Sequence, residues 1–448
     1  MKITFILPCV GKKAGRAYPR SWLMEPLAIA QLAALTPKKY DRVFYDDRLE
    51  SIPYDEKTDL VAISVETYTA RRAYQIASHF RKKNIPVVMG GFHATLAPDE
   101  VEQHADVVVM GEAEGVWEYL LRDFEQGNLQ KRYQAEKRPE LMSILPDRSI
   151  YGGRRYLDLA LVETGRGCRF SCEFCSIAGF FNGRYAARPV DDVVREIQRL
   201  KTKSIFFVDD NIAVDRQRTV KLLEALTSLG IRWIGQVSMS IANDDELLAL
   251  FYRSGCLGLL IGFESFEKET LDAMRKQVNC HFGDYDSVVQ NLHKHKLAIY
   301  GTFVFGYDSD TNQTFQRTLD FVVKNKLFFA AFNHLVPFPG TPLYQRLREQ
   351  KQLVQDDWWL SPSYRFGDVA LKTKNYSAQD LSDRCLRFRK EFYTMKSILW
   401  RATNVKANCK SPFMTLTYFM ANLLSRGDVV ERQGLPLGFD DNRKVDSE

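Results

Sequence analysis

The 448-residue sequence lacks the features that mark a secreted, membrane-spanning or nucleic-acid-binding protein. Five of its eight cysteines show no paired spacing, so we expect no disulfide framework and a reducing, cytoplasmic setting. The net charge of +6 is spread along the chain, which predicts no nucleic-acid partner. Met1 and Lys2 lead directly into a predicted strand, so we expect no signal peptide.

Long hydrophobic runs are also missing. The longest, at residues 413–424, is shorter than the roughly 20 residues needed to cross a bilayer. It follows the basic residues Arg401, Lys406 and Lys410, so a helix lying on a membrane surface is one alternative, and packing inside the protein is the other. The preceding segment, 377–397, has apolar residues at helical spacing and is predicted to pack on the rest of the protein.

The sequence does contain a compact group of three cysteines. Cys168, Cys172 and Cys175 follow the spacing C-x3-C-x2-C, directly after a predicted buried strand at 159–162. Iron–sulfur clusters are normally held by four cysteines, and no fourth lies near, so a [4Fe–4S] cluster here would keep one iron open. The alternatives are a loop of unpaired thiols or a structural zinc site, although zinc requires four closed ligands.

This spacing resembles the signature of the radical S-adenosylmethionine (radical SAM) superfamily, which places an aromatic residue before the last cysteine, as Phe174 does here. The resemblance implies that the open iron binds SAM and that the reduced cluster cleaves it to a 5′-deoxyadenosyl radical. It also implies an external electron donor such as flavodoxin or ferredoxin.

Residues 1–130 alternate predicted strands with helices. Such alternation predicts a doubly wound, Rossmann-like domain with a parallel sheet and helices on both faces. Ligands bind such sheets at the carboxyl ends of the strands. We therefore expect one mouth formed by the segments 8–16, 64–68, 90–95 and 111–115.

The same region resembles the cobalamin-binding domains that precede many radical SAM enzymes. Ser64, the pair Gly90 and Gly91, and the segment 111–114 carry the resemblance, which implies that the serine and glycines surround the nucleotide tail of cobalamin. The D-x-H-x-x-G loop that supplies a histidine to cobalt is missing after the first strand, so the resemblance leaves cobalt without an evident lower ligand. His93 is predicted to be a turn histidine bonded to backbone. The alternative for the domain is a doubly wound fold that has lost its cofactor.

A polar stretch with two prolines, Pro139 and Pro146, predicts a linker at 131–154. Residues 155–345 then form a run of strand–helix units, which predicts a partial (β/α)6 barrel with its chemistry at the carboxyl ends of the strands. Phe206, Phe207 and Phe303 are predicted as barrel core. Residues 346–448 are predicted to be a mostly helical domain on the substrate side.

The resemblance to radical SAM enzymes covers this barrel and implies where SAM is held. Asp209 or Asp210 would contact its amino group, Gln236 and Ser238 its ribose and carboxylate, and Glu264 closes a G-x-E-S match. Each acid alone could instead cap a helix, which is our interpretation of Asp215 and Asp244.

The sequence as a whole predicts a cobalamin-dependent radical SAM enzyme that methylates an unactivated carbon of an apolar metabolite of the lipid or tetrapyrrole type. In the family it resembles, one SAM methylates reduced cobalamin and another supplies the radical. The alternatives are a cyclase or carbon–carbon bond-forming enzyme that works with or without cobalamin, and a non-enzymatic iron–sulfur sensor. A methylthiotransferase is disfavoured because no second cysteine triad is present. No residue is predicted as a catalytic acid or base.

Overall fold

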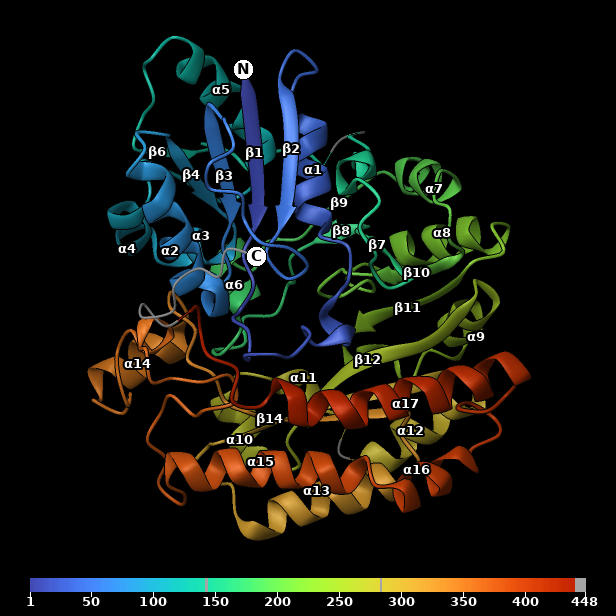
Figure 1. Cartoon of the computed structure of the whole chain (residues 1–448). Helices are drawn as coiled ribbons and strands as arrows, with labels where there is room; N and C mark the ends of the chain where they lie inside the picture. Colours follow the sequence, from blue (N-terminus) through green and yellow to red (C-terminus); the bar gives the residue numbers. More distant parts are fainter. Residues whose placement is uncertain (142–143, 283, 440–448) are drawn as a thin grey trace.

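The computed structural model describes residues 1–141, 144–282 and 284–439. Residues 142–143 of the predicted linker and 440–448 of the predicted C-terminal domain lie outside the described residues. Two six-stranded parallel sheets, joined near residue 150, dominate the described chain (Figure 1). The predicted α/β fold class is therefore confirmed.

The N-terminal sheet has the strand order β2-β1-β3-β4-β5-β6. Its strands are β1 (Lys2–Leu7), β2 (Asp41–Asp46), β3 (Leu60–Ser64), β4 (Val87–Gly90), β5 (Val107–Met110) and β6 (Arg132–Gln134). The principal helices around it are α1 (Leu27–Leu35), α2 (Ala70–Arg81), α3 (Phe92–Leu96), α4 (Pro98–His104) and α5 (Trp117–Glu125). Because β6 belongs to this sheet, the sheet extends slightly past the boundary predicted at residue 130.

Both faces of the N-terminal sheet are buried. Val61 and Ile63 pack into one hydrophobic cluster, while Leu60 and Ala62 of the same strand pack into another on the opposite face. Successive strand residues point to opposite faces, so a strand made only of apolar residues fits a sheet covered on both sides. Hydrophobic residues therefore cover most of both faces of this sheet.

The second sheet has the order β14-β13-β12-β11-β10-β7. Its strands are β7 (Ala160–Val162), β10 (Ser204–Phe207), β11 (Arg232–Val237), β12 (Cys256–Glu264), β13 (Ala298–Phe305) and β14 (Phe329–His334). The helices α7 (Val190–Gln198), α8 (Arg216–Thr227), α9 (Asp245–Arg253), α12 (Tyr285–Lys294) and α13 (Asn312–Lys324) connect them. The predicted N-caps are confirmed, since Asp215 accepts from Arg218 N and Asp244 from Leu247 N.

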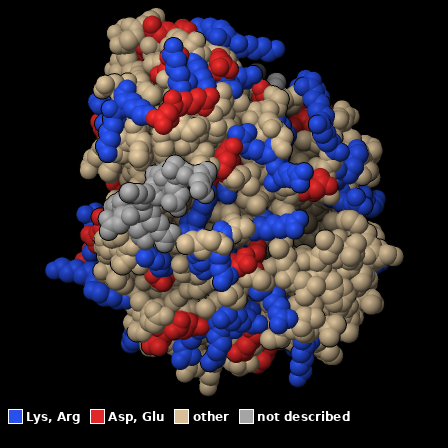
Figure 2. All heavy atoms as spheres, viewed as in Figure 1, with Lys and Arg blue, Asp and Glu red and all other residues tan. Residues whose placement is uncertain are grey.

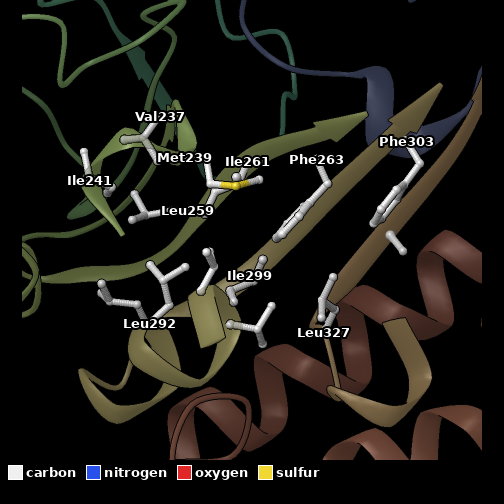
Figure 3. Packing of buried hydrophobic residues seen from close by; sticks show 14 of the residues in the cluster. Val237, Met239, Ile241, Leu259, Ile261, Phe263, Leu292, Ile299, Phe303 and Leu327 are labelled. Carbon is white, nitrogen blue, oxygen red and sulfur yellow. The ribbon is translucent and has the colours of Figure 1, made fainter. Parts of the chain in front are cut away.

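Only one face of this second sheet is sealed. Ile261, Phe263 and Phe303 pack with Leu292 and Leu327 of the surrounding elements in the largest hydrophobic cluster (Figure 3). Residues on the other face remain accessible to solvent. Ile234, on the central strand β11, is 37% exposed. Of the three predicted core phenylalanines, Phe207 and Phe303 are fully buried, whereas Phe206 is half-buried on the other face.

The C-terminal region is helical, as predicted, and includes α14 (Pro342–Glu349), α15 (Ala378–Phe392), α16 (Met395–Ala402) and α17 (Pro412–Arg432). The single helix predicted at 377–397 is two helices, because Thr394 accepts a hydrogen bond from Ser397 N and starts α16 as a new N-cap.

The chain after α17 returns to the N-terminal domain (Figure 1). Gly438 N donates to Val10 O at 2.7 Å, and Lys13 Nζ donates to two backbone carbonyls near the end of α17. A Cβ on Gly11 would lie 2.0 Å from Pro436 O, so the close approach requires glycine. The chain's own C-terminal segment therefore covers the loop after β1.

Candidate functional site

The three cysteines lie between β7 and α6 (Ser176–Phe181), on a loop whose Cys175 N donates to Cys172 O at 3.1 Å. Burial raises the pKa of Cys172 to about 11, the charges of Cys175 and Cys168 act in the same direction, and Lys276 opposes them. The thiols are thus close enough to influence one another. Within the described chain, no three His, Cys, Asp or Glu side chains already form a metal-binding group. The assignment of these cysteines to a cluster stays a prediction.

A buried carboxylate anchors the cysteine loop to the barrel. Glu173 N donates to Met274 O at 3.1 Å, and its carboxylate accepts from Tyr307 Oη at 3.1 Å and from Arg346 Nη2 at 2.7 Å. These contacts tie the loop to three separate elements of the barrel. Sequence reasoning missed Glu173, although an acidic residue inside the cysteine spacing was the available signal.

The two aspartates after β10 have different surroundings. Both oxygens of Asp209 are used by Thr164, from its N–H at 2.7 Å and its hydroxyl at 2.6 Å, and its side chain is buried. Asp209 therefore fixes the end of β7, and its contact with the SAM amino group remains a prediction. Asp210 accepts from Gly167 N at 2.8 Å, directly before the first cysteine, so of the two predicted residues Asp210 is the one beside the cysteine loop.

Glu264, at the end of β12, forms a buried ion pair. Its backbone has a positive φ of 64°, and its Oε1 lies 2.6 Å from Lys276 Nζ. Burial disfavours the charged form of Lys276, but the Glu264 carboxylate and Cys172 outweigh it and hold the pKa of that amine above its usual value. Lys276, which the sequence analysis did not identify, thus places a cation beside the cysteine loop.

The remaining predicted SAM residues lie on or near β11. Gln236 is half-buried and shares the open face of the sheet with Ile234, while Ser238 follows the strand and contacts the hydroxyl of Ser240. Phe174 is half-buried against the barrel core. The structure therefore leaves Gln236 and Ser238 accessible, and their contact with SAM remains a prediction.

A cavity of about 330 Å³ lies between the two domains. Ser64, Gly90 and Gly91 line it from the N-terminal sheet, and Arg166 and Phe181 line it from the cysteine-loop side. The predicted segments 64–68, 90–95 and 111–115 all contribute. The predicted segment 8–16 does not, because the C-terminal segment covers it; α1 takes its place.

The glycine pair fits the predicted role at this cavity. Gly91 has a φ of +106°, and a Cβ there would lie 2.9 Å from Val65 O and 3.5 Å from Ser64 Oγ. Only glycine adopts this conformation without strain. The close approach of Val65 therefore requires glycine at position 91, and the contact of the glycine pair with the cobalamin tail remains a prediction.

Arg166 joins the cysteine loop to the N-terminal domain. Its guanidinium lies 3.2 Å from Glu112, 2.7 Å from Glu114 and 2.6 Å from Glu163, all of which line the cavity. Burial opposes ionisation of Glu114, but Arg166 outweighs it and lowers the pKa of that carboxyl. Because Arg166 lies two residues before Cys168, this ion-pair group couples the two predicted cofactor sites. Sequence reasoning missed Arg166 and Glu163, which flank a glycine in the same motif.

Glu66 also lines the cavity. Its side chain is exposed to this space, yet it is densely surrounded by protein, and burial raises its pKa to about 7. Glu66, two residues after Ser64, is therefore a carboxyl group whose pKa lies above its usual value.

His93 does not line the cavity. It is fully buried in the short helix α3, with Nδ1 3.3 Å from Thr67 Oγ1 and Nε2 3.1 Å from Glu100 Oε1. The prediction of a turn histidine bonded to backbone is wrong, because the helix turns the ring into the domain core, where two side chains satisfy it.

Comparison with known proteins identifies two families within the chain. Residues 162–322 match the model of the radical SAM superfamily, and residues 24–121 match that of the B12-binding domain. These two matches coincide with the barrel and with the N-terminal sheet.

The similar proteins include enzymes with named activities. Bacteriochlorophyllide d C-12(1)-methyltransferase of Chlorobaculum tepidum is 32% identical, over 84% of this chain and 84% of its own length. Bacteriochlorophyllide d C-8(2)-methyltransferase of the same organism is 29% identical, over 84% and 87%. Anaerobic magnesium-protoporphyrin IX monomethyl ester cyclase of Cereibacter sphaeroides is 23% identical, over 99% and 81%.

Two solved structures share the fold. The methyltransferase TsrM from Kitasatospora setae, with cobalamin and a [4Fe–4S] cluster bound, aligns with a TM-score of 0.64 at 16% identity, covering 95% of this chain and 97% of that one. The radical enzyme OxsB, with aqua-cobalamin and SAM bound, gives 0.66 at 14% identity, covering 95% and 72%. Together with the matched families and the methyltransferase relatives, the arrangement of the two sheets around one cavity leads to one conclusion: the chain belongs to the cobalamin-binding radical SAM family.

Proposed function

We propose that this protein is a C-methyltransferase of the cobalamin-binding radical SAM family and that its substrate is an apolar tetrapyrrole. The observation that carries the proposal is the shared cavity, which the glycine pair lines from one domain and Arg166 of the cysteine loop lines from the other. Such a site brings a methyl donor and a hydrogen-abstracting radical to the same substrate. The bacteriochlorophyllide methyltransferases support the choice of substrate class.

The cavity lining and the adjoining cysteine loop fit the two cofactors. Cys168, Cys172 and Cys175 would hold the cluster, while Ser64 and Gly91 would admit the cobalamin tail. When bound, these groups supply the radical that removes a hydrogen atom and the methyl group that replaces it. The protein itself holds the cysteine loop in place through Glu173 and holds the two domains against each other through the ion pairs of Arg166.

The cavity that Ser64 and the glycine pair line also has apolar, aromatic walls. Phe92 lies 4.6 Å from Phe180 between ring centroids, and Phe180 lies 4.5 Å from Phe181, so three aromatic rings line one side. Leu32 and Trp117 line the side of the N-terminal domain. Aromatic side chains bury large apolar areas and contact flat rings in offset or edge geometries, which suits a tetrapyrrole macrocycle.

The test is a product analysis. Protein reconstituted anaerobically with iron, sulfide and hydroxocobalamin is supplied with reductant, SAM carrying a deuterated methyl group, and a bacteriochlorophyllide. We expect a deuterated methyl group on a substrate carbon, with one S-adenosylhomocysteine and one 5′-deoxyadenosine formed for each methyl transferred. 5′-Deoxyadenosine without S-adenosylhomocysteine, and with no gain in substrate mass, would overturn the proposal.

The second candidate is a cyclase, which the alignment of the anaerobic cyclases along 99% of this chain favours. The same experiment with magnesium-protoporphyrin IX monomethyl ester as substrate distinguishes the two. A new ring in the product without a transferred methyl group would establish cyclisation.

A further inference from the structure

The long helix α17 has its polar and apolar faces reversed. Its buried side carries the polar residues Tyr418, Asn422 and Asp428 beside a single fully buried apolar residue, Met414, whereas Leu416 and Met420 on its outer side are 61% and 63% exposed. Burial of apolar surface normally drives the opposite arrangement, so a large exposed apolar surface indicates a binding partner. The outer side of α17 is therefore a candidate binding surface.

The reversed helix is firmly held, so its exposed face is not a result of loose packing. Tyr418 Oη donates to Ile398 O at 2.8 Å. Asn422 Oδ1 accepts from Arg401 Nη2 at 3.1 Å, and the fully buried Arg401 also donates to the carbonyls of Leu327 and Phe328. Ser21 N donates to Asp428 near the other end of the helix. Polar contacts thus fix which side of α17 faces outward.

The exposed apolar residues form one surface, which we call the α17 ridge. Its members repeat at intervals of three, four or seven residues along the helix and continue onto the neighbouring α16; they are Phe413, Leu416, Met420, Leu423, Val430, Leu399 and Trp400. On the face shown in Figure 2, an uncharged area extends over the region where α16 and α17 lie in Figure 1.

Basic residues surround the α17 ridge. No acidic residue occurs between Glu391 and Asp428, whereas this segment carries Lys396, Lys406, Lys410 and Arg426 in addition to the buried Arg401. From other elements, the Arg232 guanidinium lies 4.1 Å from the centre of the Phe413 ring, and Lys326 Nζ lies 4.6 Å from that of Trp400. The rim of the ridge is consequently positive along residues 396–426, and the exposed Glu431 lies at its C-terminal end.

We infer that the α17 ridge binds the surface of a bilayer containing anionic lipids. An apolar helix face with Lys, Arg and Trp at its border is the pattern of helices that lie in the membrane interface. A second copy of this chain fits less well, because a twofold contact would place two positive rims against each other. In the described part of the chain, no helix has the length and hydrophobicity to cross a bilayer, so the contact is peripheral.

The experiment is co-sedimentation of the full-length protein with vesicles. We expect binding to vesicles of phosphatidylcholine and phosphatidylglycerol, weaker binding to phosphatidylcholine alone, and a decrease with added salt. The double variant Met420→Glu/Leu423→Glu should bind the anionic vesicles at least tenfold more weakly. The matched control is Tyr119→Glu on α5, which adds a carboxylate at an apolar position that is 59% exposed on the other domain and should bind like the wild type.

Sedimentation velocity and circular dichroism complete the test. Both variants should remain folded and monomeric, because the substituted side chains contribute little to the core. Absence of binding to anionic vesicles, or equal binding by the double variant, would overturn the inference. A wild-type dimer that the double variant separates would also overturn it, because the ridge would then join two copies of this chain.

Discussion

The two parallel sheets of this protein differ in how many of their faces are sealed. The N-terminal sheet is covered by hydrophobic clusters on both sides, whereas the barrel sheet is covered on one side and keeps Gln236 and Ile234 accessible on the other. The N-terminal sheet offers a ligand its strand ends and the part of one face, beside α1, where Ala62, Val88 and Val109 line the cavity. A sheet with one open face offers that face as well.

This difference matches the two kinds of ligand. At the N-terminal sheet, Ser64, Gly90 and Gly91 line the cavity at the strand ends, where we predict that the cobalamin tail binds. At the barrel sheet, the cysteine loop, Asp210 and the ion pair of Glu264 with Lys276 lie around the end of an open face. The two sites lie on separately packed sheets, so a substitution within one sheet should affect one site and spare the other, whereas Arg166 contacts both domains.

The largest expected effect comes from the cysteine loop. Cys172→Ala should abolish the [4Fe–4S] cluster, because the loop holds only three cysteines, while cobalamin uptake by the separately packed N-terminal sheet should persist. Iron and cobalt analyses of the reconstituted protein measure both. Cys280→Ser, outside the loop, is the control and should keep its iron. A full cluster in Cys172→Ala would contradict the assignment.

At Gly91 we expect the opposite result, namely loss of cobalamin with retention of the cluster. Gly91→Leu should abolish cobalamin uptake and keep the cluster, because a side chain at φ +106° is strained and its Cβ would lie 2.9 Å from Val65 O. An absorption spectrum after purification with hydroxocobalamin measures the loss. Gly427→Ala, where a Cβ meets nothing within 4 Å, is the control. Stoichiometric cobalt in Gly91→Leu would refute the proposed entry point.

Smaller effects, on stability and on SAM binding, should distinguish the roles of Asp209 and Gln236 in the barrel. Asp209→Ala should lower the free energy of unfolding by about 1–3 kcal/mol, since it leaves the Thr164 donors buried and unpaired. Gln236→Ala should leave stability unchanged and weaken SAM binding about tenfold, as expected for a lost hydrogen bond to a charged ligand worth about 1.5–3 kcal/mol. Thermal unfolding and equilibrium SAM binding measure the two. If Asp209→Ala weakened SAM binding and Gln236→Ala lowered stability, Asp209 would be the SAM-binding residue and Gln236 the structural one.

The smallest effect concerns Glu66. Burial raises its pKa to about 7 in the folded protein, against about 4.3 in an unfolded chain. Below about pH 4 the carboxyl is protonated in both the folded and the unfolded state. As the pH rises toward about 7, the carboxyl ionises only in the unfolded chain, so the free energy of unfolding falls. This decline ends above about pH 7, where the carboxyl is ionised in both states. Glu66→Gln should lack this component, which urea unfolding from pH 4 to pH 8 measures. Identical pH profiles would show that Glu66 ionises normally.

Much of the fold was predictable from local pattern. The strands at β3 and β5 are short apolar runs bounded by polar residues, and their length and order indicate a parallel sheet without knowledge of contacts. Boundaries were less predictable, since the break between α15 and α16 depends on one capping hydroxyl at Thr394. The cysteine spacing was visible because its residues are neighbours in the chain.

The sequence by itself determined that three cysteines share one loop, that glycines follow β4 and that acids follow β10, because each is a local property of the chain. Tertiary structure alone decided what those groups do. It paired Asp209 with Thr164, Glu264 with Lys276, and Arg166 with three carboxylates from two domains. It also turned the polar side of α17 inward. The physical reason is that burial, hydrogen bonding and charge pairing depend on which residues meet in space, and here the partners come from separate segments of the chain.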